Sequence, residues 1–306
     1  MNMNQKTGRW QTLFSVIVPA YNMQDTLAET LDSVLMQGWQ DWECIIVNDG
    51  STDDTAGIAQ AYCEKDSRFV LVTQVNTGIA AAYNAGIAQS CGQWIIMLSA
   101  DDLLLPPHLT WIAAIAVDNG SDTDSKLAII SSNGYYLYDN GSRMLAYPNN
   151  PWFTGNECSL EDLFDRCFFS TGVALRRDAI FAAGGFIPDF YAEDYYLFLR
   201  ILALGYRHHY NSAAWTIHRR NYRQRSADGL AMRKADLTTI MRVANEFALT
   251  ESQHHAFTRA CKKYQHNIRI RTILYCCLSS RVTENIIAAL RRLRQRRHVD
   301  RKPDAQ

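Results

Sequence analysis

Residues 42–55, WECIIVNDGSTDDT, join an apolar run to a polar loop and to the start of a helix. The run 42–48 is short and rich in β-branched residues, which is typical of a buried strand. Ser51 can cap the helix that follows, and Asp53 and Asp54 favour the positive end of that helix. The segment therefore predicts one complete strand–loop–helix unit.

The same unit recurs on both sides of this segment. Further strands are predicted at 14–20, 69–74 and 94–98, and helices at 24–37 and 77–90. Strands that alternate with helices at this spacing indicate βαβ units and a parallel sheet. Because the strands are continuous apolar runs, we expect helices on both faces of that sheet.

Polar residues follow each predicted strand at the edge where open parallel sheets bind ligands. These residues are Tyr21-Asn22, Asn48-Asp49-Gly50-Ser51, Asn76-Thr77-Gly78 and Ser99-Ala100-Asp101-Asp102. Asp101 and Asp102 suit Mg²⁺ or Mn²⁺, which prefer hard oxygen ligands, but they also suit a turn that caps a helix near Pro106. Asp49 could accept a hydrogen bond from a nucleobase or ribose, or could serve only the turn.

The remaining chain departs from the regular alternation. We expect a helix at about 106–118, a hairpin within 127–147, a strand at 170–177 and a helix at 192–206. From about residue 228 onward the pattern is helical.

Two further sites admit both a functional and a purely structural interpretation. Glu193 and Asp194 open the helix at 192–206, where acids complement the helix dipole and where an ionised carboxylate could act as a general base. His218 is followed by Arg219, Arg220 and other arginines, which form either a solvated basic loop or a cationic cluster suited to a diphosphate.

Composition limits the class of protein. The 306 residues are 47% hydrophobic and 20% charged with no net charge, so a strong global field toward nucleic acid is absent. The 8 cysteines form no CxxC pair, which favours free thiols in a reducing cytosol. The N-terminus lacks the apolar region of a signal peptide, and no run reaches the ~18 apolar residues of a membrane span. We therefore expect a cytoplasmic protein.

Six motifs follow one another in a specific order. They are VIVPAYN, IIVNDGSTDDT, NTGIAAAYNAGI, MLSADDLLLP, TGVALRRDAIFAAGGF and EDYYLFLRILALGY. In this order the chain resembles the family 2 glycosyltransferases of the GT-A fold over about 14–220. The resemblance implies an α/β, Rossmann-like fold with a mostly parallel sheet and helices on both faces. It implies a catalytic domain at 1–225, with a nucleotide-sugar half at about 14–105 and an acceptor half at about 106–225. A helical C-terminal region with a basic tail, 226–306, would follow.

The resemblance also implies a reaction and its residues. A sugar would pass with inversion from a nucleoside-diphosphate donor, UDP in the first place, to an acceptor hydroxyl, with Mg²⁺ or Mn²⁺ as cofactor. The residues implied in binding the nucleotide sugar are Pro19, Ala20, Tyr21, Asn22, Asp49, Gly78, Ser99, Ala100 and Asp101. The metal site would comprise Asp101, Asp102 and His218. Asp194 matches the catalytic base, and Glu193 would contact acceptor or donor.

The chain departs from the family pattern at two positions. Ser99 stands where many members have the first acid of Asp-x-Asp-Asp, and a hydroxyl is a weaker ligand for a hard cation. Tyr83 stands where many members have an arginine before Asn-x-Gly. These departures put metal affinity and phosphate contacts in question.

Arginines dominate the tail 281–302, whereas the rest of the neutral chain is net acidic, which suits a metal-dependent cleft. Residues 283–297 could form an interfacial helix on an anionic membrane or a docked helix with a solvated basic face. The first interpretation fits a peripheral protein at the inner face of the membrane, with a glycan or lipid-linked glycan acceptor from surface polysaccharide or lipopolysaccharide assembly.

Two other functions stay open: a non-catalytic nucleotide-sugar-binding protein of the same fold, and a sugar-nucleotide nucleotidylyltransferase. The second would need a Gly-rich, Arg-bearing loop after the first strand, where this chain has PAYNMQDT.

Overall fold

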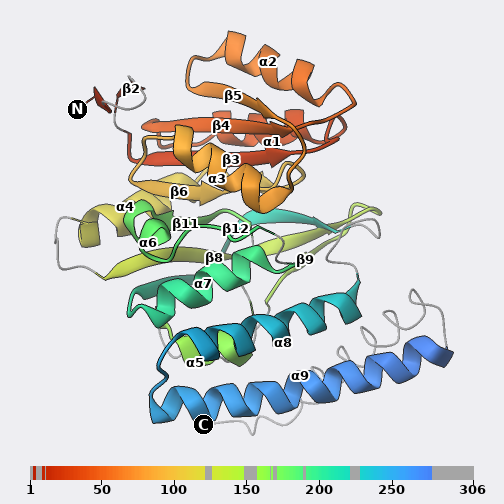
Figure 1. Ribbon diagram of the computed structural model, residues 1–306. Helices are drawn as coiled ribbons and strands as arrows, with labels where there is room; N and C mark the ends of the chain where they lie inside the picture. Colours follow the sequence, from red (N-terminus) through yellow and green to blue (C-terminus); the bar gives the residue numbers. More distant parts are fainter. Residues whose placement is uncertain are drawn as a thin grey trace, which may run out of the picture.

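A single large sheet forms the centre of the computed structural model (Figure 1). The structure describes residues 3–4, 9–10, 12–120, 126–147, 157–165, 167, 171–188, 191–220 and 228–277. The strands of the large sheet are β3 (Phe14–Ala20), β4 (Trp42–Asp49), β5 (Phe69–Gln74), β6 (Trp94–Met97), β7 (Leu103–Leu104), β8 (Leu127–Tyr138), β9 (Arg143–Leu145), β10 (Glu157–Cys158), β11 (Val173–Arg176) and β12 (Arg207–Arg220). A separate ribbon pairs β1 (Met3–Asn4) with β2 (Arg9–Trp10).

The helices confirm the expected alternation. They are α1 (Leu27–Leu35), α2 (Thr55–Lys65), α3 (Ile79–Gln89), α4 (His108–Gly120), α5 (Leu160–Asp165), α6 (Arg177–Ala182), α7 (Glu193–Ala203), α8 (Gly229–Glu246) and α9 (Glu251–Cys277). The expected hairpin is present as β8 and β9, which pair antiparallel.

The strand order is β10-β12-β8-β11-β6-β3-β4-β5. Strands β5, β4, β3 and β6 are mutually parallel, as the βαβ pattern predicted. Strand β11 lies antiparallel between β6 and β8, and β12 returns parallel to β8. The antiparallel β11 therefore joins the four parallel strands to the later ones in one continuous sheet, which is mixed rather than mostly parallel because β7, β9, β10 and β11 all pair antiparallel.

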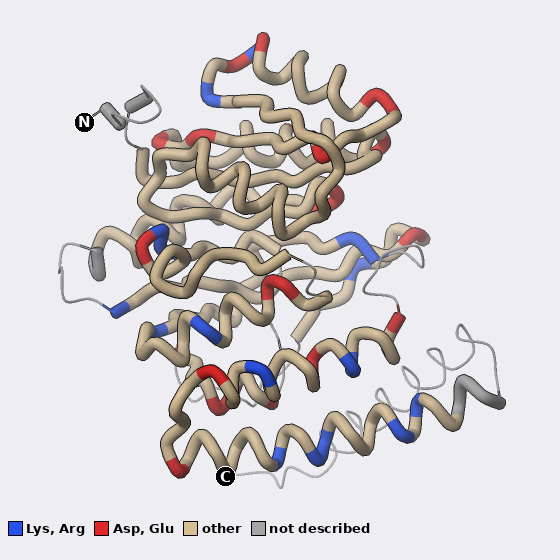
Figure 2. Tube along the Cα trace, in the orientation of Figure 1, with Lys and Arg blue, Asp and Glu red and all other residues tan. Residues whose placement is uncertain are grey.

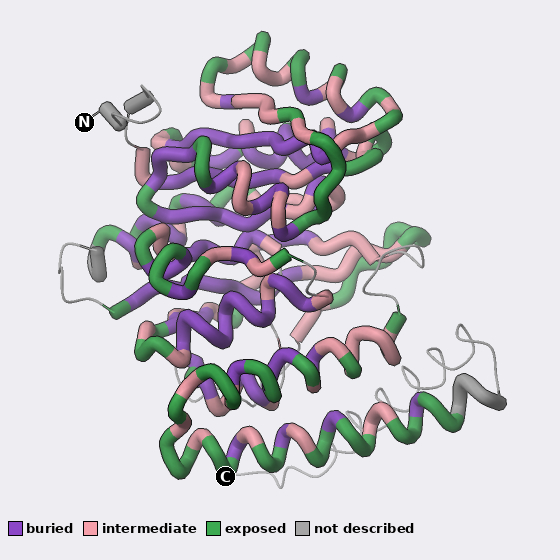
Figure 3. The backbone as a smooth tube through the Cα atoms, viewed as in Figure 1, coloured by how far each residue is buried: buried purple, intermediate pink, exposed green. Residues whose placement is uncertain are grey.

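Helices cover both faces of this sheet because successive strand residues point to opposite sides. On β3, Ile17 belongs to one apolar cluster, with α3 and α5 to α9, whereas Val16 and Val18 belong to the other, with α1, α2 and α4. Figure 3 shows the result as a buried central layer between partly exposed helices. The predicted two-sided α/β architecture is thus confirmed.

Helix α3 approaches the sheet very closely at Gly86. A Cβ at this position would lie 2.5 Å from Cγ2 of Ile17 and 3.1 Å from Cγ2 of Val47. Only glycine allows this approach, which fixes the height of α3 above β3 and β4.

The C-terminal helices are part of the same body (Figure 1). Ile240 and Val243 of α8 are fully buried and share an apolar cluster with α7 and with Tyr264 of α9. Lys and Arg recur along α9 (Figure 2). The basic tail, including the helix expected at 283–297, lies outside the described residues, and no described helix is long and apolar enough to cross a membrane.

The cysteines for which side chains are described are free, as predicted: Cys44, Cys63, Cys91, Cys158, Cys167 and Cys261. The predicted helix cap at Ser51 is wrong. Helix α2 begins at Thr55, and the Ser51 hydroxyl instead accepts a hydrogen bond from the Asn22 amide at 3.0 Å. Ser51 therefore ties two rim loops together rather than starting a helix.

Candidate active site

The loops after β3 and β4 are held together by side chain to backbone hydrogen bonds. Asn22 has a positive φ of 54°, a conformation that asparagine tolerates better than most residues. Its Oδ1 accepts from the Thr52 amide at 2.8 Å, and the Met23 amide donates to Oγ1 of Thr55 at 2.7 Å. This rim places Tyr21, which is 45% exposed, at the edge of the sheet beside buried Ala20.

Asp49 organises the loop that starts α3. Its Oδ1 accepts from the Gln74 side-chain amide at 2.8 Å and from the Thr77 backbone at 3.0 Å, and its Oδ2 accepts from the Gly78 backbone at 2.9 Å. A carboxylate offers about four acceptor positions, so three serve the protein and one on Oδ2 remains for a ligand. Asp49 is therefore a loop anchor that still fits the expected contact to a nucleobase.

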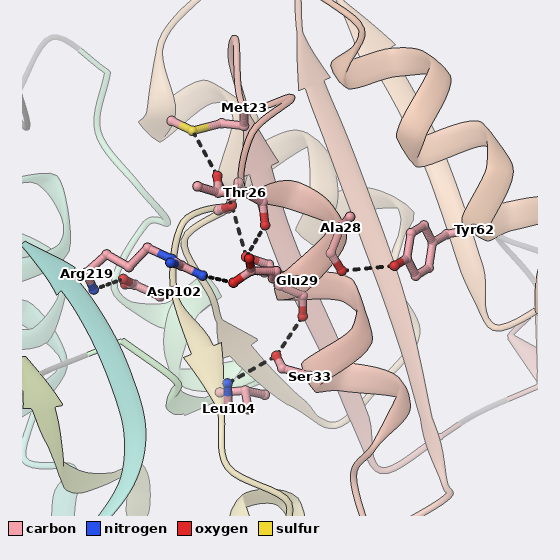
Figure 4. Close-up of polar contacts among 11 residues, drawn as sticks. Met23, Thr26, Ala28, Glu29, Ser33, Tyr62, Asp102, Leu104 and Arg219 are labelled. Atoms are coloured by element: carbon pink, nitrogen blue, oxygen red, sulfur yellow. Dashed lines mark hydrogen bonds and ion pairs between the residues drawn. The ribbon is translucent and has the colours of Figure 1, made fainter. Parts of the chain in front are cut away.

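The loop Ser99–Asp102 is pinned to α1 (Figure 4). The Ala100 carbonyl accepts from the hydroxyls of Thr26 and Thr30, each at 2.9 Å. The Ser99 amide lies 3.4 Å from the Thr171 hydroxyl. These contacts hold the two acids that follow Ala100 in one place.

Strand register brings Asp102 to His218, 116 positions further along the chain. Leu103 of β7 pairs with Ile217 of β12 in antiparallel register, so the residues next to this pair, Asp102 and His218, lie beside each other. Oδ2 of Asp102 lies 2.9 Å from Nδ1 of His218, and Oδ1 accepts from the Arg219 amide at 2.9 Å.

Asp102 does not have the position expected of a direct metal ligand. It is fully buried, and each of its oxygens accepts a hydrogen bond from β12. A carboxylate accepts, so Nδ1 of His218 carries the proton and Nε2 is the ring nitrogen left for a ligand. This arrangement favours Asp102 as the residue that orients His218.

Cationic side chains at the end of β12 contact both halves of the molecule. The Arg219 guanidinium forms an ion pair with Glu29 of α1 (Figure 4). The Arg220 guanidinium lies 4.5 Å from the ring centroid of Tyr136, whose ring also meets His218 edge-on at 5.8 Å. The end of β12 is thus connected to α1, to β7 and to β8.

The start of α7 holds the expected base. Glu193 is buried, and Asp194 is partly exposed with its Oδ1 accepting from the Tyr195 amide at 2.6 Å. Further along α7, the buried Arg200 donates to the carbonyls of Ala183 and Gly185. Arg200 therefore fixes α7 against the turn that follows α6.

Tyr83 of α3 is a buried tyrosine that packs against the turn after α6. It is 4% exposed, and its ring stacks on Phe186 with centroids 4.8 Å apart. Burial raises the pKa of its hydroxyl well above the usual 10, and the charges of four nearby carboxylates raise it further. These carboxylates are Asp194, Glu193, Asp102 and Asp101. The two predicted acidic pairs, distant in sequence, thus both lie close enough to Tyr83 for their charge to raise its pKa.

A small set of protein ligands fits a divalent cation here. Among the described residues there is no group of three or more His, Cys, Asp or Glu side chains placed to hold a metal ion. Asp101 and His218 are both partly exposed, and Asp102, the neighbour of Asp101, lies 2.9 Å from the His218 ring. Mg²⁺ commonly uses one or two carboxylates, waters and substrate phosphates, so the residues fit a site that a bound diphosphate completes.

Residues 15–182, more than half of the chain, match the family described as Glycosyl transferase family 2. The chain belongs to this family. The match ends before α7, so Glu193, Asp194 and His218 lie outside it. The matched residues include the loops after β3, β4, β5 and β6, whereas α7 and β12 lie beyond the match.

Similarity between this family 2 member and individual curated relatives extends over only part of the chain. It is 42% identical over 94 residues, 30% of this chain and 37% of the relative, to the putative teichuronic acid biosynthesis glycosyltransferase TuaG of Bacillus subtilis (strain 168). The matches cover between 18% and 37% of the lengths of the first five curated relatives.

Two solved structures share the fold. TarS 1–349 of S. aureus, in complex with UDP-GlcNAc, has a TM-score of 0.64 at 19% identity and covers 81% of this chain and 71% of its own. The mannosyltransferase PcManGT of Pyrobaculum calidifontis, in complex with GDP-Man and Mn²⁺, has a TM-score of 0.62 at 18% identity. The match covers 92% of this chain and 81% of PcManGT. At these identities the similarity supports the GT-A fold alone.

Sequence reasoning named most of the residues at this edge but missed two relations. Tyr83 was noted only as a departure from the family pattern, and its nearness to both acidic pairs was not foreseen. The pairing of Asp102 with His218 was also missed, although a His after an apolar run and an Asp before a short one are compatible with adjacent strands.

Proposed function

We propose that this protein transfers a sugar from a nucleoside-diphosphate donor to an acceptor hydroxyl with inversion at the anomeric carbon. The observation that carries the proposal is the pairing of Asp102 with His218 at 2.9 Å at the sheet edge of a chain that matches Glycosyl transferase family 2, with Glu193 and Asp194 at the start of α7. The acids after β6 belong to the nucleotide half and those on α7 to the later half, so the two pairs can face opposite sides of a bound sugar. Inversion needs such opposed groups.

Each residue has a stated part in this reaction. Asp49, Gly78 and the rim at Pro19 to Asn22 bind the nucleotide, and Ser99 and Ala100 line the path to the sugar. Asp194 takes the proton of the acceptor hydroxyl as that oxygen attacks the anomeric carbon. The leaving diphosphate then carries the electron pair of the broken bond.

The cationic side of the site receives that leaving group. A divalent cation, Mg²⁺ or Mn²⁺, held by Asp101 and Nε2 of His218, would offset the charge of the diphosphate. Asp102 keeps His218 in the tautomer that exposes Nε2. Glu193, buried beside Asp194, supports the orientation of the acceptor.

The substrate classes rest on relatives. UDP-GlcNAc is bound by TarS and GDP-Man by PcManGT, so these two donors are the first to test. The likeness to TuaG favours an acceptor from cell-surface polysaccharide synthesis, either a glycan or a lipid-linked glycan. With a lipid-linked acceptor, the protein would work at the inner face of the membrane, and the basic tail would provide peripheral contact.

Asp194→Asn tests the assignment directly. A panel of nucleotide sugars is screened by thermal shift with and without Mn²⁺, and hydrolysis of the stabilising donors is then measured. We expect Asp194→Asn to keep the thermal shift and to lose turnover by about 10²–10⁴-fold, the usual contribution of a general base.

Asp178→Asn is the matched control. Asp178 also lies in the first turn of a helix, and its Oδ1 accepts from the next backbone amide at 2.7 Å, but its side chain is 65% exposed beside Arg176. Its substitution should leave turnover unchanged. Full turnover in Asp194→Asn would refute the base, and binding without turnover in the wild type would favour the non-catalytic binder.

A further inference from the structure

We propose that the Arg220 guanidinium, held on the ring of Tyr136, binds the terminal phosphate of the nucleoside diphosphate. The inference rests on the proposed function and deepens it, because it names a phosphate-binding residue beyond the matched residues 15–182. It follows from where β12 ends, from which side chains share a face there and from how the guanidinium is held.

The end of β12 lies at the same sheet edge as the end of β6. Strand β11 is antiparallel both to β6 and to β8, so β6 and β8 run in one direction. Strand β12 is parallel to β8 and therefore runs in that direction too. The last residues of β12, His218 to Arg220, thus lie at the edge where open sheets of this kind bind ligands.

Successive side chains of β12 alternate between two faces at this edge. Arg219 reaches α1, where its guanidinium forms an ion pair with Glu29 (Figure 4). His218 and Arg220 both meet the ring of Tyr136 on β8. The centroid of that ring lies 5.8 Å from the centroid of the histidine ring and 4.5 Å from Cζ of the arginine. Arg220 therefore shares a face with the histidine proposed to hold the cation.

A ligand can reach these side chains, because Tyr136, His218 and Arg220 are each partly exposed. The His218 side chain keeps 23% of its surface exposed. Its Nδ1 is occupied by Asp102 at 2.9 Å, so Nε2 is the nitrogen left for a cation. A diphosphate bound to that cation would come within reach of the guanidinium on the same face.

The order of strands indicates which part of the nucleotide lies there. Asp49, which fits a contact to the base, ends β4, whereas β12 lies further along the sheet, past β3, β6, β11 and β8. A nucleotide that lies across this edge with its base at β4 points its phosphates toward β12. Arg220 should therefore meet the terminal phosphate rather than the base or the ribose.

The contact with Tyr136 prepares the guanidinium for an anion. An aromatic ring next to the planar group restricts its rotation and leaves its charge in place. The fork of N–H donors matches the oxygens of a phosphate and forms charge-assisted hydrogen bonds with them. Arg219 carries the same group, but its ion pair with Glu29 ties it to α1. The structure thus gives two adjacent arginines different tasks.

The test compares Arg220→Gln and Arg220→Lys with wild type in the full chain. Calorimetric titration with Mn²⁺ present gives the Kd of UDP and GDP and of the monophosphates UMP and GMP, and a thermal scan gives the melting temperature. Since base, ribose and first phosphate are the same in each pair, the comparison isolates the terminal phosphate.

Arg68→Gln is the matched control. Cζ of Arg68 also lies close to an aromatic ring, 3.8 Å from the centroid of Trp42. Arg68 comes just before β5, however, and so lies at the opposite edge of the sheet. Its substitution should leave the affinity for every nucleotide unchanged.

We expect Arg220→Gln to raise the Kd of the diphosphate that the wild type binds by about 10- to 100-fold, the usual contribution of a hydrogen bond to a charged group. The Kd of the matching monophosphate should stay within about threefold, because only a screened, more distant charge is lost. Arg220→Lys should recover part of the diphosphate affinity, since it keeps the charge but not the fork.

Two results overturn the assignment of Arg220. One is an unchanged Kd of the diphosphate in Arg220→Gln. The other is an equal loss of affinity for diphosphate and monophosphate, which indicates that Arg220 supports the sheet edge and does not contact the terminal phosphate. A wild-type protein that binds neither UDP nor GDP would instead overturn the proposed function itself, so the wild-type titration tells the two failures apart.

Discussion

Asp102→Asn tests whether a buried carboxylate prepares His218 for a cation. The amide keeps an oxygen that can accept from the Arg219 backbone, so the loop should stay in place. Its NH₂ group would face Nδ1 of His218, which would then have to accept rather than donate. The ring proton moves to Nε2, and Nε2 can no longer bind a cation.

Loss of such an orienting partner commonly costs about 10- to 100-fold in metal affinity, which corresponds to roughly 1.4–2.7 kcal/mol. The assay is a Mn²⁺ titration followed by the electron paramagnetic resonance signal of free Mn²⁺, with UDP present. Far-ultraviolet circular dichroism and melting temperature establish that the variant is folded.

The control is the same substitution in a His218→Ala background. If Asp102 acts through His218, Asp102→Asn should add little there, because the residue that it orients is absent. An unchanged Mn²⁺ affinity in the single variant would refute the tautomer argument. An equal loss in both backgrounds would make Asp102 a direct ligand instead.

Three further predictions concern stability. Burial lowers the pKa of His208 to about 3 and of His108 to about 4, below the ordinary ~6.5 of the unfolded chain. The contribution of these two neutral rings to the free energy of unfolding is therefore fully present above about pH 6.5 and is lost as the pH falls toward the folded pKa values. Urea unfolding should therefore give a free energy lower by about 4 kcal/mol at pH 5 than at pH 7, and equal values would contradict neutral buried rings. Ile240→Ala should cost about 2–5 kcal/mol, because Ile240 of α8 is fully buried in the core shared with α7; a cost below 1 kcal/mol would mean that α8 is only loosely attached. Gly86→Ala should destabilise the fold by about 1–3 kcal/mol, since its Cβ would overlap Ile17, whereas Gly141→Ala, with open space around its Cβ, tests the cost of positive φ alone.

The sequence predicted the strands and the rim well, and the reason is local. A run such as 14–20 is apolar throughout because both of its faces are covered, and that pattern is visible without any tertiary information. The polar residues at the strand ends follow from chain direction, since parallel strands end at one edge. Asp49 and Asp101 could be named for these reasons.

Relations between distant segments could not be predicted in the same way. The pairing of Asp102 with His218 depends on β7, a strand of two residues, and on its register with β12. So short a strand carries almost no periodic signal. For Ser51 the local pattern was misleading. It suits a helix cap, but in the fold the Ser51 hydroxyl accepts a hydrogen bond from the Asn22 amide of a neighbouring loop.

Continuity of the sheet limits how this protein can respond to ligands. Strand β11 is hydrogen-bonded to β6 on one side and to β8 on the other, so the nucleotide half and the later strands are not separate bodies that could rotate about a hinge. The end of β12 adds cross-links to α1 through Glu29 and to β7 through Asp102. On the proposed function, closure over a donor would therefore come from loops at the sheet edge, whereas Asp194 on α7 and His218 on β12 are carried by elements of the fold itself. A site built in this way stabilises charge without first rearranging, which is the condition under which fixed donors lower a reaction barrier most effectively.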